Sequence, residues 1–118
     1  RLTYDNQVFG GIVMGVGLGV TEERVLDRQT GKMANANLHD YKIPTMNDVA
    51  SEHLCVPIDI PDTDFNTTGT KGLGEPATIP TAAAIANAVN DAIGVRMTDA
   101  PLTPKQLLQQ IAAQRKEG

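Results

Sequence analysis

The sequence predicts an α+β fold made of a glycine-rich buried helix, a β-hairpin, an edge strand and two C-terminal helices. Three observations carry this prediction: apolar residues at helical spacing near the N-terminus, an alternating apolar run in the middle, and two capped amphipathic stretches near the C-terminus. The 118 residues suit one domain, 1–118. Hydrophobic residues make up 41% of the chain but aromatic residues only 3%, so an independent core would be thin. This composition indicates a piece of a larger domain.

The N-terminal helix is expected between Gln7 and Val20. Val8, Ile12 and Val16 follow one another at a spacing of four, which is the spacing of one helix face. The glycines of this stretch each cost about 1 kcal/mol relative to alanine in a helix interior. We therefore expect the helix to be buried, at a place where the missing side chains let another backbone or a ligand approach closely.

The middle of the chain carries two β predictions. Residues 21–27 and 32–37 flank a polar turn in which Gly31 supplies a positive φ, as expected for a hairpin. Apolar residues then alternate with other residues over 54–60, which is strand periodicity. Because Pro57 has no N–H, this strand is expected at the edge of a sheet.

Two helices are expected near the C-terminus. The first covers 81–93 and ends at Gly94, since glycine is the usual residue just past a helix end. The second starts at Thr103, with Pro104 at the first helical position and Gln106 two residues later. This arrangement predicts a capping box in which the Thr103 and Gln106 side chains satisfy the free backbone N–H groups.

Charge and composition exclude several functions. The net charge is −4 and the ten Lys and Arg are scattered, which argues against a nucleic-acid site. The longest apolar run, 12–20, is too short and too rich in glycine to cross a membrane. The single cysteine, Cys55, excludes an internal disulfide and an iron–sulfur cluster held by this chain alone, and it is expected in a core or interface. His39 and His53 have no partner at ligand spacing, so no protein metal site is predicted.

The loop before the first C-terminal helix carries the clearest chemistry. Its glycines let the backbone turn sharply and lie against a bulky ligand, and they deliver the Glu75 carboxylate just before Pro76. The dipole of the following helix favours the ionised form of Glu75, and a carboxylate held ionised in a partly dry pocket is a candidate general base. A solvated turn glutamate is the alternative interpretation, and it is the more common case.

Several short motifs follow one another in order over most of the chain. They are Gln7-Val8-Phe9-Gly10-Gly11, Met14-Gly15 with Gly17, Glu22-Glu23, Asp27 with Gly31, Asp40-Tyr41-Lys42-Ile43-Pro44, Lys71-Gly72-Leu73-Gly74-Glu75-Pro76, the alanine-rich stretch 83–92 and Pro101-Leu102-Thr103-Pro104. In this order they resemble the C-terminal stretch of the molybdopterin-binding large subunit of the molybdenum hydroxylases, the xanthine dehydrogenase and aldehyde oxidase family. The resemblance implies that residues 1–118 are the C-terminal segment of a molybdopterin-binding domain.

The resemblance also implies roles for particular residues. Glu75 matches the family's catalytic base, which takes a proton from a hydroxyl bound to molybdenum so that the oxygen attacks an electrophilic carbon of an aldehyde or N-heterocycle. Gln7 would approach the pterin with its amide. Gly72, Leu73 and Gly74 would line the same pocket with backbone atoms. These five residues form the candidate cofactor and catalytic site.

The same resemblance implies molybdopterin with molybdenum as the cofactor of the full enzyme, with iron–sulfur clusters and FAD on other domains or subunits. The expected partners are the remainder of the large subunit, the iron–sulfur and flavin modules and a small-molecule substrate. Asn6 stands where the family usually has glycine. The chain alone lacks the family's other cofactor loops, so we expect it to be inactive by itself and to form a dimer or aggregate.

A non-enzymatic α+β module that binds a partner chain is the alternative function. The glycine-rich and alanine-rich helices, which suit close contact, motivate it. The compartment stays open between the cytoplasm, which is favoured, and the periplasm. The residues do not identify the substrate either, because the resemblance implies that other segments contribute most of its contacts.

Overall fold

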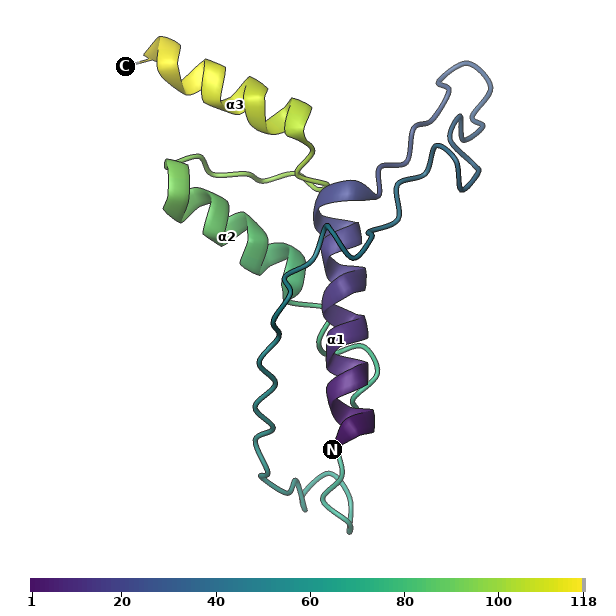
Figure 1. Ribbon diagram of the computed structural model, residues 1–118, viewed down its shortest axis with the longest axis vertical. Coiled ribbons are helices and arrows are strands. Elements are labelled where there is room, and N and C mark those ends of the chain that lie inside the picture. The colour runs from purple at the N-terminus through teal and green to yellow at the C-terminus, as the bar shows by residue number, and fades with distance from the viewer. Residues whose placement is uncertain (118) are drawn as a thin grey trace.

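The computed structural model describes residues 1–117, which form three α-helices and one π-helical turn (Figure 1). Helix α1 spans Leu2–Val16, and η1 continues it over Gly17–Thr21. Helix α2 spans Thr81–Ile93 and α3 spans Pro104–Glu117. The segment between η1 and α2 consists of turns and extended chain. The described residues therefore make a mostly helical structure.

The predicted N-terminal helix is confirmed, but it begins at Leu2, before the expected start at Gln7. Asp5 lies in the first turn, where the helix dipole favours a carboxylate, and its side chain pairs with Arg1 at 3.6 Å. The helix does not stop at Val16 but widens into the π-helical turn η1. Residues 2–6 do not continue the apolar spacing of Val8, Ile12 and Val16. The helical periodicity therefore predicted the start of the helix too late.

The expected burial of this helix is found on one face of α1 only. Gly11 and Gly15 are buried, whereas Leu2 and Met14 on the rest of the helix are exposed. The reason is that the described residues supply a close neighbour on one side of α1 only, where α2 and the turn before it contact the glycines.

The two C-terminal helices are confirmed together with their ends. Helix α2 has the predicted bounds, and Gly94 follows it with a φ of +70° while its N–H donates to the carbonyl of Asn90 at 2.8 Å. The capping box also forms. The Thr103 N–H donates to the Gln106 Oε1 atom at 3.2 Å, and the Gln106 N–H donates to the Thr103 Oγ1 atom at 3.3 Å.

A small hydrophobic core lies between α2, α3 and the segment that joins them. Val95, Met97 and Leu102 are buried there, and the side chains packed against them are Ala86, Val89, Leu107 and Ile111. The N–H of Leu102 donates to the carbonyl of Gly19 at 2.6 Å, which ties this core to η1. In Figure 1, α2 and α3 both run away from the end of α1 that carries η1.

The predicted β-hairpin is not formed. Among the described residues the only β pairing is an isolated antiparallel bridge between Leu26 and Met33. Gly31 does have the expected positive φ, +69°. Two backbone hydrogen bonds flank this bridge, but beyond it the Asn35 amide side chain replaces the ladder by accepting from the Val25 N–H at 3.0 Å and donating to the Glu23 carbonyl at 2.7 Å. Asparagine side chains compete with the backbone in this way, and an isolated two-stranded hairpin is marginal in water.

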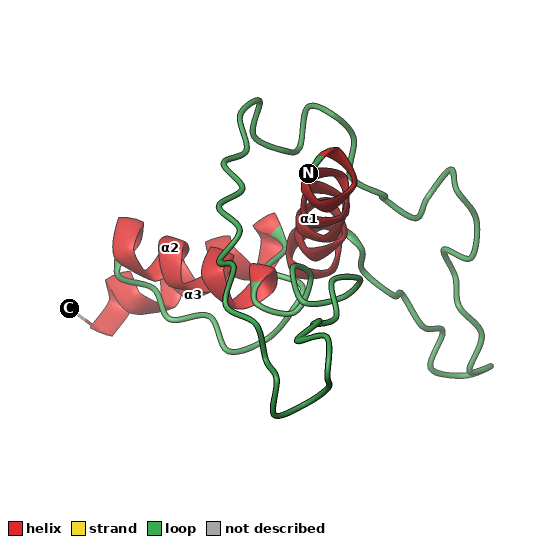
Figure 2. Cartoon of the chain, turned by 90° about the horizontal axis from the view of Figure 1, so that it is seen from below, coloured by secondary structure: helices red, strands yellow, loops and turns green. Residues whose placement is uncertain are grey.

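The predicted edge strand over 54–60 is not formed either, and Figure 2 shows no strand in the part of the chain that the structure describes. The segment is extended but unpaired, because no other described segment lies alongside it as a β partner. The α+β assignment is therefore corrected: the helices are present, and the β elements are absent from residues 1–117.

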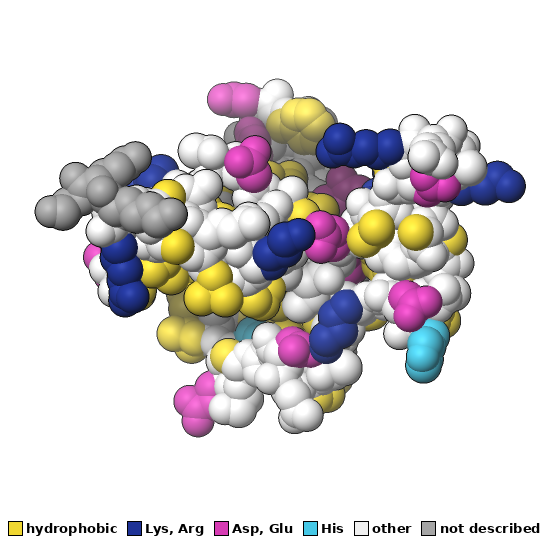
Figure 3. Space-filling view, turned by 90° about the horizontal axis from the view of Figure 1, so that it is seen from above, with side chains coloured by type: hydrophobic (Ala, Val, Ile, Leu, Met, Phe, Trp, Pro, Cys, Tyr) yellow, Lys and Arg dark blue, Asp and Glu magenta, His cyan; other side chains and the backbone are white. Residues whose placement is uncertain are grey.

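The chain is far less compact than an independent domain of its length. Its accessible surface is 9245 Å², whereas a folded monomer of 118 residues exposes roughly 6,200 Å². Its radius of gyration is 18.1 Å, whereas roughly 13.5 Å is typical for this length. Figure 3 shows exposed hydrophobic side chains interspersed with charges of both signs. Much of the apolar surface thus finds no cover within the described chain, as expected for a piece of a larger domain.

Candidate functional site

The candidate site is built on the glycine face of α1. A Cβ atom placed on Gly11 would lie 2.8 Å from the Cβ of Ala77 and 3.2 Å from the backbone nitrogen of Thr78. One turn further along, Gly15 lies directly against the side chain of Thr81. Because no side chain intervenes, the turn that leads from the glycine loop into α2 packs on the backbone of α1.

Backbone hydrogen bonds hold this turn immediately after Glu75. The Glu75 carbonyl accepts from the N–H of Thr78 at 2.9 Å and from the N–H of Ile79 at 3.4 Å. The Thr81 hydroxyl donates to the carbonyl of Ala77 at 2.8 Å. The backbone of Glu75 is therefore part of an ordered turn that packs against Gly11 of α1.

The Glu75 side chain itself is exposed, and it forms no hydrogen bond or ion pair with another described residue. The sequence predicted a carboxylate in a partly dry pocket at the N-terminus of the following helix. In this chain Glu75 precedes the first residue of α2 by six positions and faces solvent, which is the geometry of a solvated turn glutamate. Any desolvation of this carboxylate has to come from outside residues 1–117.

Gln7 lies on the same face of α1 as Gly11, one turn closer to the N-terminus. Its side chain is exposed and makes no hydrogen bond to the described part of the chain. The turn after Glu75 packs on Gly11, which lies one helical turn from Gln7. No hydrogen bond links the side chains of Gln7 and Glu75 to each other.

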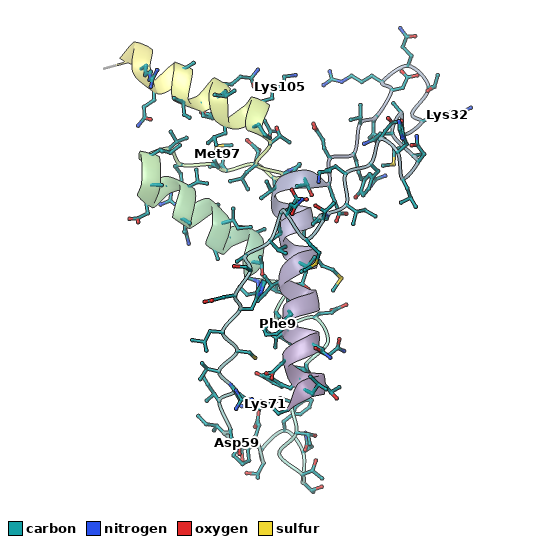
Figure 4. The ribbon with its side chains drawn as sticks, in the orientation of Figure 1. Phe9, Lys32, Asp59, Lys71, Met97 and Lys105 are labelled. Carbon is teal, nitrogen blue, oxygen red and sulfur yellow. The ribbon has the colours of Figure 1, made fainter. Side chains whose placement is uncertain are left out.

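The glycines next to Glu75 border open space. A Cβ atom placed on Gly72 or Gly74 would meet no heavy atom within 4 Å, whereas Leu73 between them is half-buried. Figure 4 shows Lys71, just before them, at the level of the N-terminal end of α1. The loop backbone at 72 and 74 is thus accessible to a molecule that approaches from outside.

Asn66 organises the polar loop that precedes these glycines, and the sequence reasoning did not single it out. Its Oδ1 atom accepts from the Thr68 N–H at 3.1 Å and the Thr70 N–H at 3.1 Å, and its Nδ2 atom donates to the Thr70 carbonyl at 2.8 Å. The Asp62 N–H closes the loop on the carbonyl of Gly69 at 3.1 Å. The polar composition of the loop indicated turns, but not which side chain would be the hub.

An apolar groove of about 620 Å³ lies between α1, α2 and residues 48–53. None of the predicted site residues lines it, although it reaches Ala77 in the turn after Glu75. Its apolar lining comes mainly from three residues of each helix, namely Val8, Ile12, Val16, Ala84, Ile85 and Ala88. Helical periodicity identified Val8, Ile12 and Val16 as one apolar face, but it could not show that the face would stay uncovered.

Asp48 lies at the rim of this groove and carries the most perturbed carboxylate of the described chain. The Lys42 ammonium group donates to Asp48 Oδ2 at 2.7 Å, and the N–H and hydroxyl of Thr45 donate to the same oxygen at 2.7 and 2.8 Å. These contacts, with Lys42 first, lower the pKa of Asp48 from 3.8 to about 2. Asp48 is thus a structural anchor of its loop.

A hydrogen bond between Tyr41 and Glu22 connects the loop that contains Tyr41 to the residue that follows η1. The Tyr41 hydroxyl donates to Glu22 Oε2 at 2.8 Å, and this hydrogen bond raises the pKa of Tyr41. Cys55 is buried as predicted, and burial, together with the neighbouring Asp5 carboxylate, raises the pKa of its thiol. A thiol of this kind is a packing residue and a poor nucleophile.

Within residues 1–117, no three His, Cys, Asp or Glu side chains gather closely enough to hold a metal ion. No helix in the same part of the chain combines the length and hydropathy needed to cross a bilayer.

Comparison with known proteins shows which protein family this chain is similar to. A family model described as a molybdopterin cofactor-binding domain matches residues 1–50, a range that includes Gln7 but not Glu75. A putative xanthine dehydrogenase molybdenum-binding subunit of Escherichia coli K12 is 46% identical over 110 residues, which are 92% of this chain and 14% of that protein. The aldehyde oxidoreductase molybdenum-binding subunit of the same organism is 33% identical over 109 residues, 92% of this chain and 15% of that protein.

Solved structures agree with these relatives. The chain is similar to quinoline 2-oxidoreductase of Pseudomonas putida 86, with a TM-score of 0.72 and 34% identity over 92% of this chain and 14% of that one. A Cu,Mo-containing CO dehydrogenase has the same fold over 97% of this chain and 14% of its own, with a TM-score of 0.77 and 23% identity. The chain thus spans about one seventh of the length of the proteins that it matches.

Proposed function

Since this chain belongs to the family of the molybdenum-binding subunits of xanthine dehydrogenase and aldehyde oxidoreductase, we propose that it is the C-terminal part of such a subunit and contributes the general base of its active site. The reaction class is the hydroxylation of an aldehyde or N-heterocycle at a molybdenum–pterin centre. The base is Glu75, and Gln7 and residues 72–74 face the cofactor. The observation that carries the proposal is the support of the Glu75 turn by the glycine face of α1.

The residues present fit a large polar cofactor in three respects. The backbone of Gly72 and Gly74 is open, so a flat group can approach the N–H and carbonyl groups of the loop without meeting a side chain. The Gln7 amide is exposed and carries both donors and an acceptor, which suits the edge of a pterin. The Glu75 carboxylate has no competing partner among the described residues.

The chain's own contribution to the reaction is proton transfer and positioning. When bound, the molybdenum–pterin group supplies a Lewis acid and a two-electron acceptor. One carboxylate oxygen of Glu75 accepts a proton as the nucleophile forms, and the ordered turn that follows keeps the backbone of Glu75 in place. The remainder of the subunit excludes water from the carboxylate, which is exposed in residues 1–117.

The test is the substitution Glu75→Gln in the full-length subunit. The amide has nearly the same shape but cannot accept the proton, so we expect turnover to fall by about 10²–10⁴-fold. Molybdenum and pterin content should stay at the wild-type level, because Glu75 is not proposed to hold the cofactor. Turnover of an aldehyde or N-heterocycle with a dye as electron acceptor measures the loss.

Glu23→Gln is the matched control, since Glu23 is also an exposed glutamate but lies far from the loop in the sequence. It should leave turnover unchanged. Near-normal turnover of Glu75→Gln with intact cofactor would refute the assignment of the base. Glu75 would then be a structural turn residue, and the chain would contribute packing alone.

A further inference from the structure

The side chain of Thr81, the first residue of α2, makes two contacts at once. A Cβ atom placed on Gly15 would lie 2.8 Å from the Cγ2 atom and 2.9 Å from the Oγ1 atom of Thr81, so both branches of the side chain lie against the backbone of α1. The same Oγ1 atom donates to the carbonyl of Ala77 at 2.8 Å. The contact with α1 therefore restricts the rotation of a side chain that is already stiff, and it orients the hydroxyl towards the turn.

The carbonyl of Ala77 depends on this hydroxyl. Pro76 and Pro80 have no N–H, and the N–H of Thr81 donates to the carbonyl of Thr78 at 3.3 Å instead. Within residues 1–117 no backbone N–H donates to the carbonyl of Ala77. Because the hydrogen bond from the hydroxyl is partly buried, its loss would leave an acceptor that water satisfies only in part.

The turn that this hydroxyl closes begins at Glu75. The Glu75 carbonyl accepts from the N–H of Thr78 at 2.9 Å and from the N–H of Ile79 at 3.4 Å. The Oγ1 atom of Thr78 is buried without a partner in the described chain, so it adds no hydrogen bond to the turn. Between residues 75 and 81, the bond from Thr81 is thus the only side-chain hydrogen bond that the structure describes.

We propose that Thr81 is a positioning residue for Glu75. Its hydroxyl, held against Gly15, fixes the turn that carries the backbone of the proposed base. Without this bond the turn gains freedom, and the carboxylate spends less time in the geometry that proton transfer requires. The inference rests on the proposed function, because Thr81 has this role only if Glu75 is the base.

The experiment compares Thr81→Val with Thr81→Ser in the full-length subunit. Valine keeps the branched shape against Gly15 but has no hydroxyl, whereas serine keeps the hydroxyl and loses one methyl group. We expect Thr81→Val to lower kcat and kcat/KM equally, by about tenfold, with molybdenum content at the wild-type level. Thr81→Ser should retain wild-type turnover. Full turnover of Thr81→Val, or the same loss in Thr81→Ser, would overturn the proposal.

Hydrogen exchange reports on the turn without any turnover. The amides of Thr78 and Ile79 should exchange about fivefold to tenfold faster in Thr81→Val than in the wild type or in Thr81→Ser. Unchanged exchange would overturn the role of the hydroxyl in holding the turn. If Thr81→Val does not fold, Thr81→Ala removes the same hydroxyl without adding a methyl group and replaces it in every comparison.

The Glu75→Gln background separates positioning of the base from a general effect on stability. Thr81→Val should cause no further loss of turnover there, because no base remains to be positioned. The same proportional loss in both backgrounds would overturn the positioning role.

The two proposals can fail separately. A large loss in Glu75→Gln with full turnover of Thr81→Val would overturn the role of Thr81 and leave the base standing. Full turnover of Glu75→Gln would refute the proposed base, and the role of Thr81 with it.

Discussion

Gly11 on α1 and Ala77 in the turn after Glu75 are in such close contact that a Cβ atom on the glycine would lie 2.8 Å from the Cβ of Ala77. Real side-chain atoms do not approach so closely, so any side chain at position 11 has to push the turn away. This contact links the sequence feature that was hardest to explain, a helix rich in glycine, to the residue that carries the proposed chemistry.

The first prediction concerns this contact in the full-length subunit. Gly11→Ala should displace the Glu75 turn and lower turnover by about tenfold to a hundredfold, because small misplacements of a catalytic group are costly. Gly10→Ala is the matched control, since a Cβ at position 10 meets no atom within 4 Å. It should keep full turnover and stabilise the helix by up to about 1 kcal/mol. Equal turnover of the two variants would contradict the positioning role of Gly11.

The second prediction concerns the Asn66 hub. Asn66→Ala removes the acceptor of the Thr68 and Thr70 N–H groups and the donor to the Thr70 carbonyl. Each such bond contributes about 0.5–1.5 kcal/mol, so exchange of the loop amides should become roughly tenfold faster or more. Asn47→Ala serves as control, because Asn47 makes no side-chain hydrogen bond to a described residue. Unchanged exchange in Asn66→Ala would show that the loop is held by other contacts.

The third prediction concerns the pH dependence of the loop around Asp48. The pKa of Asp48 is lowered from 3.8 to about 2, so its contacts stabilise the folded loop above pH 3.8 and are lost as the pH falls through about 2. An NMR titration of the Asp48 carboxyl carbon should show a midpoint near 2. Lys42→Met removes the largest cause and should move the midpoint toward 3.8, with the Thr45 donors still holding it below that value. A wild-type midpoint at 3.8 would refute these contacts in solution.

The fourth prediction concerns association of the isolated 118-residue chain. Its exposed surface exceeds that of a typical domain by about half, and the excess includes the apolar side chains of residues 54, 56, 58 and 60. We expect dimers or larger aggregates in light scattering, and no hydroxylase turnover. A clean monomer at high concentration would contradict the first expectation. Stoichiometric molybdenum with dye reduction by an aldehyde would contradict the second.

Sequence patterns predicted a structural feature correctly wherever all the residues that form it lie within one short segment. The Thr103 and Gln106 capping box, the left-handed Gly94 and the bounds of α2 all follow from residues within one or two turns of each other, and all three formed as predicted. The family could likewise be recognised from the order of motifs along the chain. These features need no knowledge of how distant segments meet.

The β predictions were wrong because a strand is defined by its neighbour. The alternation over 54–60 is real, and its apolar side chains are exposed, but residues 1–117 contain no strand beside it. At the hairpin the turn formed around Gly31, whereas the Asn35 side chain took the place of the ladder. Periodicity describes which side of a segment is apolar, and it is silent on what covers that side.

The sequence by itself thus predicted the two C-terminal helices, their caps and the family, and it named Glu75 as the candidate base, because these depend on residue type, short spacing and the order of motifs along the chain. Only the tertiary structure decided that Gly11 and Gly15 contact the turn after Glu75, and that the Glu75 carboxylate faces solvent in this chain. Those facts depend on contacts between residues far apart in the chain, and such contacts form only when the backbone brings the segments within a few ångströms of each other.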